Sequence, residues 1–377
     1  MNLKKAIIDL FFIFILVTCI AYGIKYKDNG KDLAEFNIEN RNITAKFIEE
    51  IINSKEEDIY LFTGLKEEKG NIKNKEFNKS KESNIVEIVG NSSLLFNSTI
   101  LFIDDKKGCL IDKSVAYDLF GSYDVKGREI DVEGKSYTIR DVLNNKENIV
   151  VIESNLEKEM ELLVLDITNK DERYIENFSN KYGLENNYIT NKFYKETSNL
   201  VSLILPIIIE FIIIISMFRL IKTQKNKLAK KIILIMVLLL FIYFFYLIIN
   251  VKLKINYNII PNEWSDFDYW SNMITKYYEK NKELLFIKKY SMDIPLINHM
   301  IKSIICSIVA IIVFFILKNR IKLINIKALL RLLIAIIFIE GLIIYKAKVY
   351  SYIVIYLLPY YYTTLFIISY IKIKELK

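Results

Sequence analysis

The 377-residue sequence is poor in the residues that build most metal sites, disulfide frameworks and flexible linkers. It holds one histidine, three cysteines, four prolines and 11 glycines. A lone histidine, His299, excludes a multi-histidine metal site and argues against a histidine-based catalytic triad. Few glycines and prolines argue against long disordered linkers. We therefore expect no cofactor and no metal.

The three cysteines are too few and too scattered for a disulfide framework. Cys19 and Cys306 lie in apolar runs, whereas Cys109 lies in a charged part of the chain. Because membrane depth should keep the three side chains apart, we expect no pair among them.

Long apolar runs are the dominant feature of the sequence, which is 53% hydrophobic and 25% charged. Apolar runs of about 18 residues or more indicate membrane spans. Six segments qualify: Ile7–Tyr22, Leu200–Phe218, Ile232–Val251, Ile301–Leu317, Ala328–Tyr345 and Val349–Ile371. Lys4 and Lys5 before the first run also fit a cleaved signal peptide, but five further runs favour an uncleaved anchor.

The distribution of lysine and arginine predicts the orientation of these spans. The loops 219–231 and 318–327 are rich in Lys and Arg and contain no acid, so both belong in the cytoplasm. Six spans then place both termini in the cytoplasm and residues 25–198 outside the plasma membrane. That outer segment has 34 acids against 26 Lys and Arg. Anionic lipid headgroups explain the basic loops, so no nucleic acid is needed.

Residues 25–198 are enough for a domain with its own core, and we expect them to fold alone. Helical and strand patterns interleave, which predicts an α+β domain. The predicted helices are Arg41–Ser54, Lys113–Phe120 and Lys170–Tyr182; the predicted strands are Asp58–Thr63, Asn84–Val89, Thr99–Ile103, Ile149–Ile152, Leu162–Ile167 and the hairpin Glu129–Val132 with Ser136–Val142. The predicted fold class is an α-helical polytopic membrane protein with an α+β extracytoplasmic domain. The layout is a first anchor (1–24), this domain (25–198), spans two and three (199–252), an outer aromatic segment (253–299) and spans four to six with a cytoplasmic tail (300–377).

Four consecutive segments carry a family resemblance: Gly108–Asp112, Ala116–Gly121, Val125–Ile130 and Gly134–Val142. They form a short strand, a helix ending in Leu-Phe-Gly, a turn and a hairpin. In this order they resemble the extracytoplasmic core domain of MacB/FtsX-type ABC transporter permeases, over roughly residues 43–151. The chain departs from the smaller permeases of that family, which have four spans, in having six predicted spans.

The resemblance implies a non-catalytic permease subunit that a separate ABC ATPase drives, paired with a second permease copy or a related chain. Lys225, Lys227 and Lys230 lie in a cytoplasmic loop where such an ATPase would couple, and the helix 194–220 would pass movement outward. Two alternatives remain. One is a membrane-anchored sensor or scaffold without an ATPase, and the other is a membrane enzyme that uses Asp266 and Asp268.

Two acids lie within predicted spans, Glu210 in the second and Glu340 in the fifth. A charged acid at the bilayer centre costs about 2.5–3.5 kcal/mol on insertion scales, so such acids face protein or water. Each is read either as a functional group or as a packing contact. Asp9 lies close to Lys4 and Lys5, and we expect it to pair there.

An aromatic segment, residues 264–270, contains both tryptophans and the acids Asp266 and Asp268. Its composition is typical of an anchor at the membrane interface. Residues 271–290 after it are expected to form a helix lying on the membrane. No serine, cysteine or paired-acid catalytic arrangement can be read from the sequence.

Overall fold

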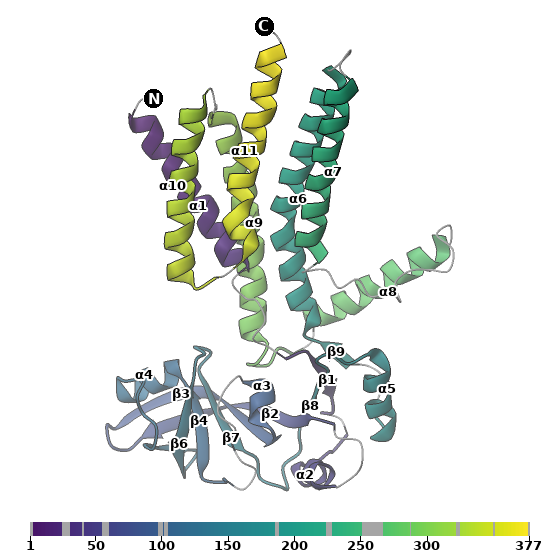
Figure 1. Ribbon diagram of the computed structural model, residues 1–377. Helices are drawn as coiled ribbons and strands as arrows, with labels where there is room; N and C mark the ends of the chain where they lie inside the picture. Colours follow the sequence, from purple (N-terminus) through teal and green to yellow (C-terminus); the bar gives the residue numbers. More distant parts are fainter. Residues whose placement is uncertain are drawn as a thin grey trace. The chain divides into compact units, whose positions relative to one another are not determined.

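The computed structural model describes residues 3–24, 31–39, 41–54, 60–96, 101, 105–184, 188–223, 228–250, 267–286, 288–321, 325–349 and 351–375. The chain divides into two units, which are described separately (Figure 1). The helical domain comprises residues 1–27, 196–274 and 299–377, and the sheet domain comprises residues 28–195 and 275–298.

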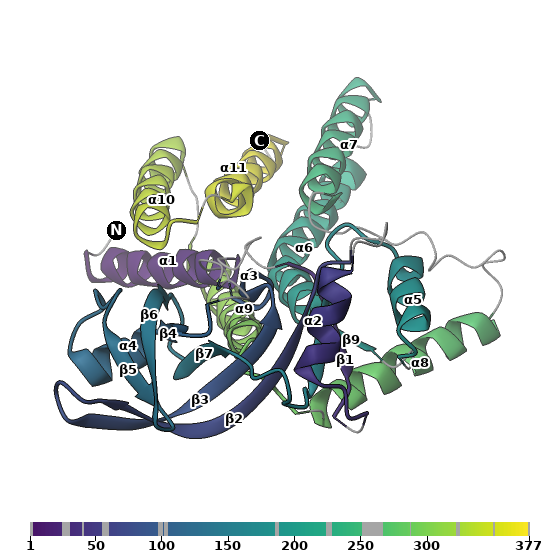
Figure 2. The ribbon, with the colours of Figure 1, turned by 90° about the horizontal axis from the view of Figure 1, so that it is seen from below.

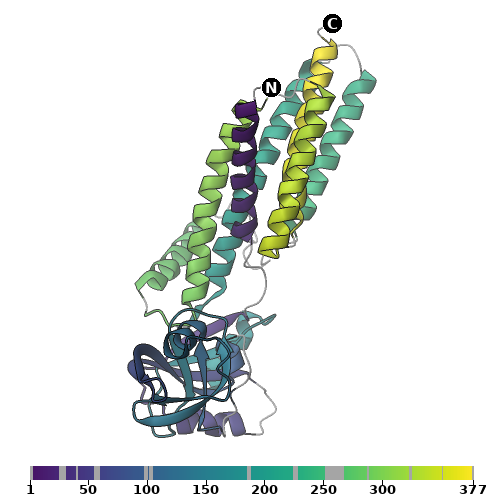
Figure 3. The same ribbon diagram turned by 90° about the vertical axis from the view of Figure 1, so that its left-hand side faces the viewer.

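The helical domain is built from long apolar helices that run side by side (Figure 3). They are α1 (Leu3–Ile24), α6 (Lys192–Thr223), α7 (Leu228–Asn250), α9 (Ile294–Arg320), α10 (Ile326–Ala347) and α11 (Tyr352–Glu375). Helix α8 (Phe267–Phe286), between α7 and α9 in the sequence, has residues in both domains. Within the described residues, five helices are long and apolar enough to cross a membrane: α1, α6, α9, α10 and α11. Helix α7 covers the third predicted span, but several of its side chains lie outside the described set, so six spans stay a prediction.

The helices pack through apolar and aromatic side chains. Tyr361 of α11 is fully buried and its ring lies 4.9 Å from that of Phe314 on α9. Asp9 pairs with a different residue from the one expected. Its carboxylate accepts a hydrogen bond from Arg320 of α9 (2.8 Å), not from Lys4 or Lys5. The pair joins two helices, and a short-range sequence argument could not find it.

The cysteine prediction is wrong in one respect. Cys19 of α1 and Cys306 of α9 lie within hydrogen-bond reach of each other, so membrane depth does not separate them. All three cysteines are free thiols. Because the two helices come from opposite ends of the sequence, their pairing could not be read from spacing.

The sheet domain contains one nine-stranded sheet, in the order β3-β7-β4-β6-β5-β2-β8-β1-β9. Its strands are β1 (Leu33–Asn37), β2 (Phe62–Asn74), β3 (Lys79–Gly90), β4 (Gly108–Asp112), β5 (Glu129–Val132), β6 (Lys135–Leu143), β7 (Ile149–Glu153), β8 (Leu162–Asp166) and β9 (Tyr188–Thr190). Strand β2 also pairs with β3 from Thr63 to Asn74 (Figure 2). The six strands β3, β7, β4, β6, β5 and β2 therefore form a closed barrel. The hairpin β2–β3 is shared by two lobes, because β2 pairs with β8 at Phe62–Leu65 and with β5 at Ile72–Lys73.

Four short helices cover this sheet: α2 (Ala45–Asn53), α3 (Ser92–Leu95), α4 (Lys113–Phe120) and α5 (Glu172–Lys181). Their ends follow local sequence rules. Thr44, Asp112 and Asp171 each accept a backbone hydrogen bond at a helix start, which satisfies a donor left free there. Gly121 ends α4 with φ of +70°, a backbone conformation that glycine adopts without strain.

The α+β interpretation is confirmed, and the predicted hairpin 129–142 and the helices near 113–120 and 170–182 are present. The long hairpin β2–β3 was missed beyond its ends. The middle of β2 reads Lys-Glu-Glu-Lys-Gly-Asn and has no apolar alternation, because its charged side chains form ion pairs and hydrogen bonds, such as those of Glu67 with Ser291 and of Glu68 with Lys158. The strand predicted at Thr99–Ile103 lies largely outside the described residues.

Candidate functional site

Residues 288–293, which we call the insertion segment, pack into the sheet domain although they lie far from it in sequence. Tyr290 and Met292 are buried in one apolar cluster with Leu65, Val86 and Ile88. Burying side chains of this size contributes about 1.5–3 kcal/mol each. The insertion segment is therefore part of the sheet-domain core.

Polar contacts fix the same segment in place. Ser291 is fully buried, and its backbone N–H and its hydroxyl both donate to the Glu67 carboxylate on β2. Asn84 of β3 donates to the Ser291 hydroxyl at 3.2 Å. Lys288 forms an ion pair with Glu161 at 2.6 Å. Charge-assisted bonds of this kind are stronger than neutral ones, so they hold the insertion segment against β2 and β3.

Two buried acids meet where the insertion segment passes β1. Glu35 and Asp293 are almost fully buried, and their carboxyl groups lie close enough to raise the pKa of Glu35. Burial raises the pKa of Glu35, and the nearby Asp293 raises it further. Burial also raises the pKa of Asp293 to about 6, with a smaller contribution from Glu67, while Lys289 acts in the opposite direction.

This acid pair predicts that the insertion segment is held less firmly as pH rises. A carboxyl group whose folded pKa is raised stabilises the fold below its ordinary pKa, and that stability is lost as pH rises through the folded value. Between pH 5 and pH 8 we expect the segment to lose on the order of 2 kcal/mol of protection. Hydrogen exchange at residues 290–293 of the full chain, corrected for intrinsic rates, measures this loss.

Glu35→Gln is the control for that measurement. The amide keeps a hydrogen bond to Asp293 but removes the acid that most needs a proton. Protection in this variant should depend much less on pH. An unchanged pH dependence would show that the buried pair is not its source.

Helices α6 and α9 each carry residues of both domains without a break, as α8 also does. Helix α6 has its first residues, up to Lys195, in the sheet domain and the rest in the helical domain. Helix α9 likewise has 294–298 in the sheet domain and 299–320 in the helical domain. Lys195 anchors the start of α6 through an ion pair with Asp32 at 2.9 Å. The insertion segment leads directly into α9.

Just inside the helical domain, three helices are tied together by Ser303 of α9. Its buried hydroxyl lies 3.0 Å from the carbonyl of Gly23 on α1 and 3.2 Å from that of Ser198 on α6. Ser198 in turn bonds His299 of α9 at 2.9 Å. Gly23 is the penultimate residue of α1, where a helix lacks partners for its last carbonyls. We call Gly23, Ser198, His299 and Ser303 the helix junction.

The predicted intramembrane acids lie on buried helix faces. Glu210 is 2% exposed and accepts a hydrogen bond from the Tyr360 hydroxyl on α11 at 2.9 Å. Its other oxygen, and one oxygen of the equally buried Glu340, have no hydrogen-bond partner among the described atoms. The two acids lie on different helices, α6 and α10. The Glu210–Tyr360 bond ties α6 to α11 inside the bilayer.

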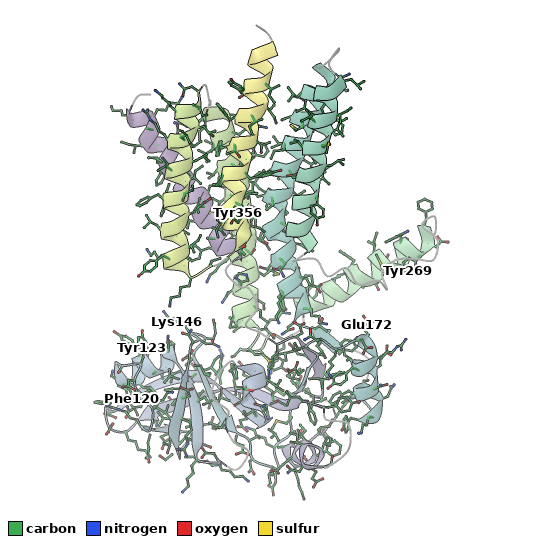
Figure 4. All side chains as sticks on the ribbon, in the orientation of Figure 1. Phe120, Tyr123, Lys146, Glu172, Tyr269 and Tyr356 are labelled. Atoms are coloured by element: carbon green, nitrogen blue, oxygen red, sulfur yellow. The ribbon has the colours of Figure 1, made fainter. Side chains whose placement is uncertain are left out.

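Several other residues that the sequence singled out lie in or next to segments that the structure does not describe. Lys225, Lys227 and Asp266 fall outside the described residues, and the side chain of Lys230 is not described. Asp268 is exposed in the first turn of α8. Tyr269 lies on the same helix (Figure 4). Its ring is edge-on to that of Trp270, with ring centres 5.8 Å apart. This aromatic pair is of the kind expected for the predicted interface anchor.

Neither the insertion segment nor the helix junction could be predicted from local sequence patterns. Lys288-Lys289-Tyr290-Ser291-Met292-Asp293 has neither helical nor strand periodicity, and its partners are some 200 residues earlier. The one available signal was Asp293-Ile294-Pro295, since proline in the first turn marks a helix start.

Comparison with known proteins returns structures and no sequence family. No family model matches the chain, and no curated protein matches it. Among solved structures, the periplasmic region of MacB from Actinobacillus actinomycetemcomitans is similar at 14% identity and a TM-score of 0.33, covering 45% of this chain and 89% of that one. The extracellular domain of the ABC-type transporter YknZ from Gram-positive bacteria is similar at 13% identity and a TM-score of 0.32, covering 42% and 98%.

Both structures come from the family that the sequence motifs resemble. At these scores the likeness carries no conclusion about what this chain binds, moves or assembles with.

Proposed function

We propose that this chain is the permease-like subunit of an ABC-type mechanotransmission system and performs no chemistry itself. A separate ATPase would act on the cytoplasmic loops, and movement of the helical domain would reach the sheet domain outside the membrane. One observation carries the proposal: α6 and α9 each continue unbroken from one domain into the other, and within the helical domain Ser198 of α6 is bonded to His299 and Ser303 of α9.

The anchoring of both helices supports transmission over simple tethering. A flexible linker would absorb a displacement, whereas a continuous helix moves as a rigid element. Lys195 fixes α6 to Asp32, which directly precedes β1. The insertion segment fixes α9 to Glu67 on β2. By the family resemblance, two such permeases would pair in the membrane.

The proposal requires a cytoplasmic contact with an ATPase, and the basic loop 219–231 is the best candidate. The protein purified in mild detergent after crosslinking should retain a separate ATPase. Replacing Lys225, Lys227 and Lys230 by glutamate should reduce that retention by about tenfold, which corresponds to about 1.4 kcal/mol.

The matched control reverses three exposed charges of the hairpin β2–β3: Lys69, Lys73 and Lys79. This triple variant should retain the ATPase as the unaltered protein does. If neither the control variant nor the unaltered protein retains an ATPase, the mechanotransmission proposal is wrong. The alternative, a membrane-anchored sensor or scaffold, is then favoured.

A further inference from the structure

Two of the chain's three thiols face each other across α1 and α9. The side chains of Cys19 and Cys306 lie next to each other, and both are half-buried. The third, Cys109, is fully buried in the sheet domain.

The backbones of α1 and α9 also approach each other closely beside this pair. A Cβ atom placed on Gly23 would lie 3.7 Å from Cβ of Cys306. Gly23 is one helical turn from Cys19. The Ser303–Gly23 hydrogen bond of 3.0 Å holds the two helices at this separation.

We propose that Cys19 and Cys306 are a reversible redox pair that closes as a disulfide between α1 and α9. The oxidant would be a small-molecule disulfide. One cysteine thiolate attacks it and releases the first small thiol. The other cysteine then attacks the mixed disulfide and releases the second. The two cysteines together lose two protons and two electrons, and the oxidant gains them.

The position of the pair fits this chemistry. Cys19 is five residues from Ile24, the last residue of α1, or roughly 7.5 Å along the axis at 1.5 Å per residue. The thiols therefore lie near one surface of the bilayer, within reach of a soluble oxidant. A closed disulfide would fix α1 to α9 beside the helix junction and prevent the two helices from sliding.

The test counts free thiols in the full-length protein in native membranes. Membranes are treated with oxidised glutathione, denatured, and labelled with maleimide-polyethylene glycol, which adds one gel shift for each free thiol. We expect three shifts in the reduced protein, one after oxidation, and three again after reduction with dithiothreitol. Three shifts after oxidation would overturn the proposal.

Two variants make the result specific. Cys306→Ser with Ile305→Cys moves the thiol to a position that is 56% exposed, away from α1. This variant should keep all its shifts after oxidation, and bridging as efficient as that of the native pair would contradict the assignment. Cys19→Ser with Gly23→Cys places a thiol opposite Cys306, and it should bridge if the helices have the described separation.

Discussion

Tyr290→Ala should destabilise the sheet domain by about 3 kcal/mol although Tyr290 lies outside the sequence segment that forms its strands. The side chain is 3% exposed and lies in the same cluster as Leu65, Val86 and Ile88. Truncating a large buried side chain leaves a cavity that the surroundings fill only in part. Hydrogen exchange of the β2, β3 and β7 amides in the full chain would show the loss.

Tyr278→Ala is the matched control, because this tyrosine of α8 is 66% exposed. Its removal should change stability by less than about 0.5 kcal/mol. Equal effects of the two variants would mean that Tyr290 does not belong to the sheet-domain core.

The same contacts change the expectation that residues 25–198 fold by themselves. Such a fragment lacks Tyr290 and Met292 and leaves Glu67 without its bonds to Ser291. We now expect the fragment 28–195 to expose apolar surface and aggregate. Joining residues 275–298 to it through a flexible linker should restore a folded, soluble domain.

Sequence patterns predicted the elements of this fold that depend on contacts between residues close together in the chain. The cap residue Asp112, the terminating Gly121 and the turn Glu133-Gly134 each act within a few residues, so their helices and hairpin were found. The spans were found because a bilayer requires long uninterrupted apolar runs. The charged parts of strands β2 and β3 were missed because they are strands through backbone pairing with each other, and they lack the alternating apolar residues of a buried strand.

The candidate site depended on contacts that no local pattern records. Ser303 joins Gly23 and Ser198, which are 280 and 105 residues away in sequence. A serine within an apolar run looks the same whether it bonds its own helix, as Ser216 does to Ile212, or two neighbouring helices. Only the three-dimensional arrangement distinguishes the two cases.

Ser303→Val should uncouple the two domains if the helix junction transmits movement. Valine leaves the carbonyls of Gly23 and Ser198 without the hydroxyl, and the volume that it adds is matched in the control variant below. An unsatisfied buried carbonyl costs about 1–3 kcal/mol, enough to loosen α1 and α6 from α9. We expect the ATP-driven movement of the sheet domain to fall to a small fraction of its normal amplitude.

Ser216→Val is the control for this variant, because its hydroxyl bonds Ile212 on its own helix at 2.7 Å. It should leave the movement intact. Equal loss in both variants would indicate general damage to the helical domain and not the loss of a specific tie.

The distance between one label in each domain, with and without ATP, tests transmission most directly. Spin labels would replace Lys146, exposed in the sheet domain (Figure 4), and Lys327, exposed at the start of α10, with the native cysteines changed to serine. With the copurified ATPase in a lipid bilayer, ATP should shift the distance distribution, and Ser303→Val should abolish the shift. An identical distribution with and without ATP in the otherwise unaltered chain would contradict mechanotransmission.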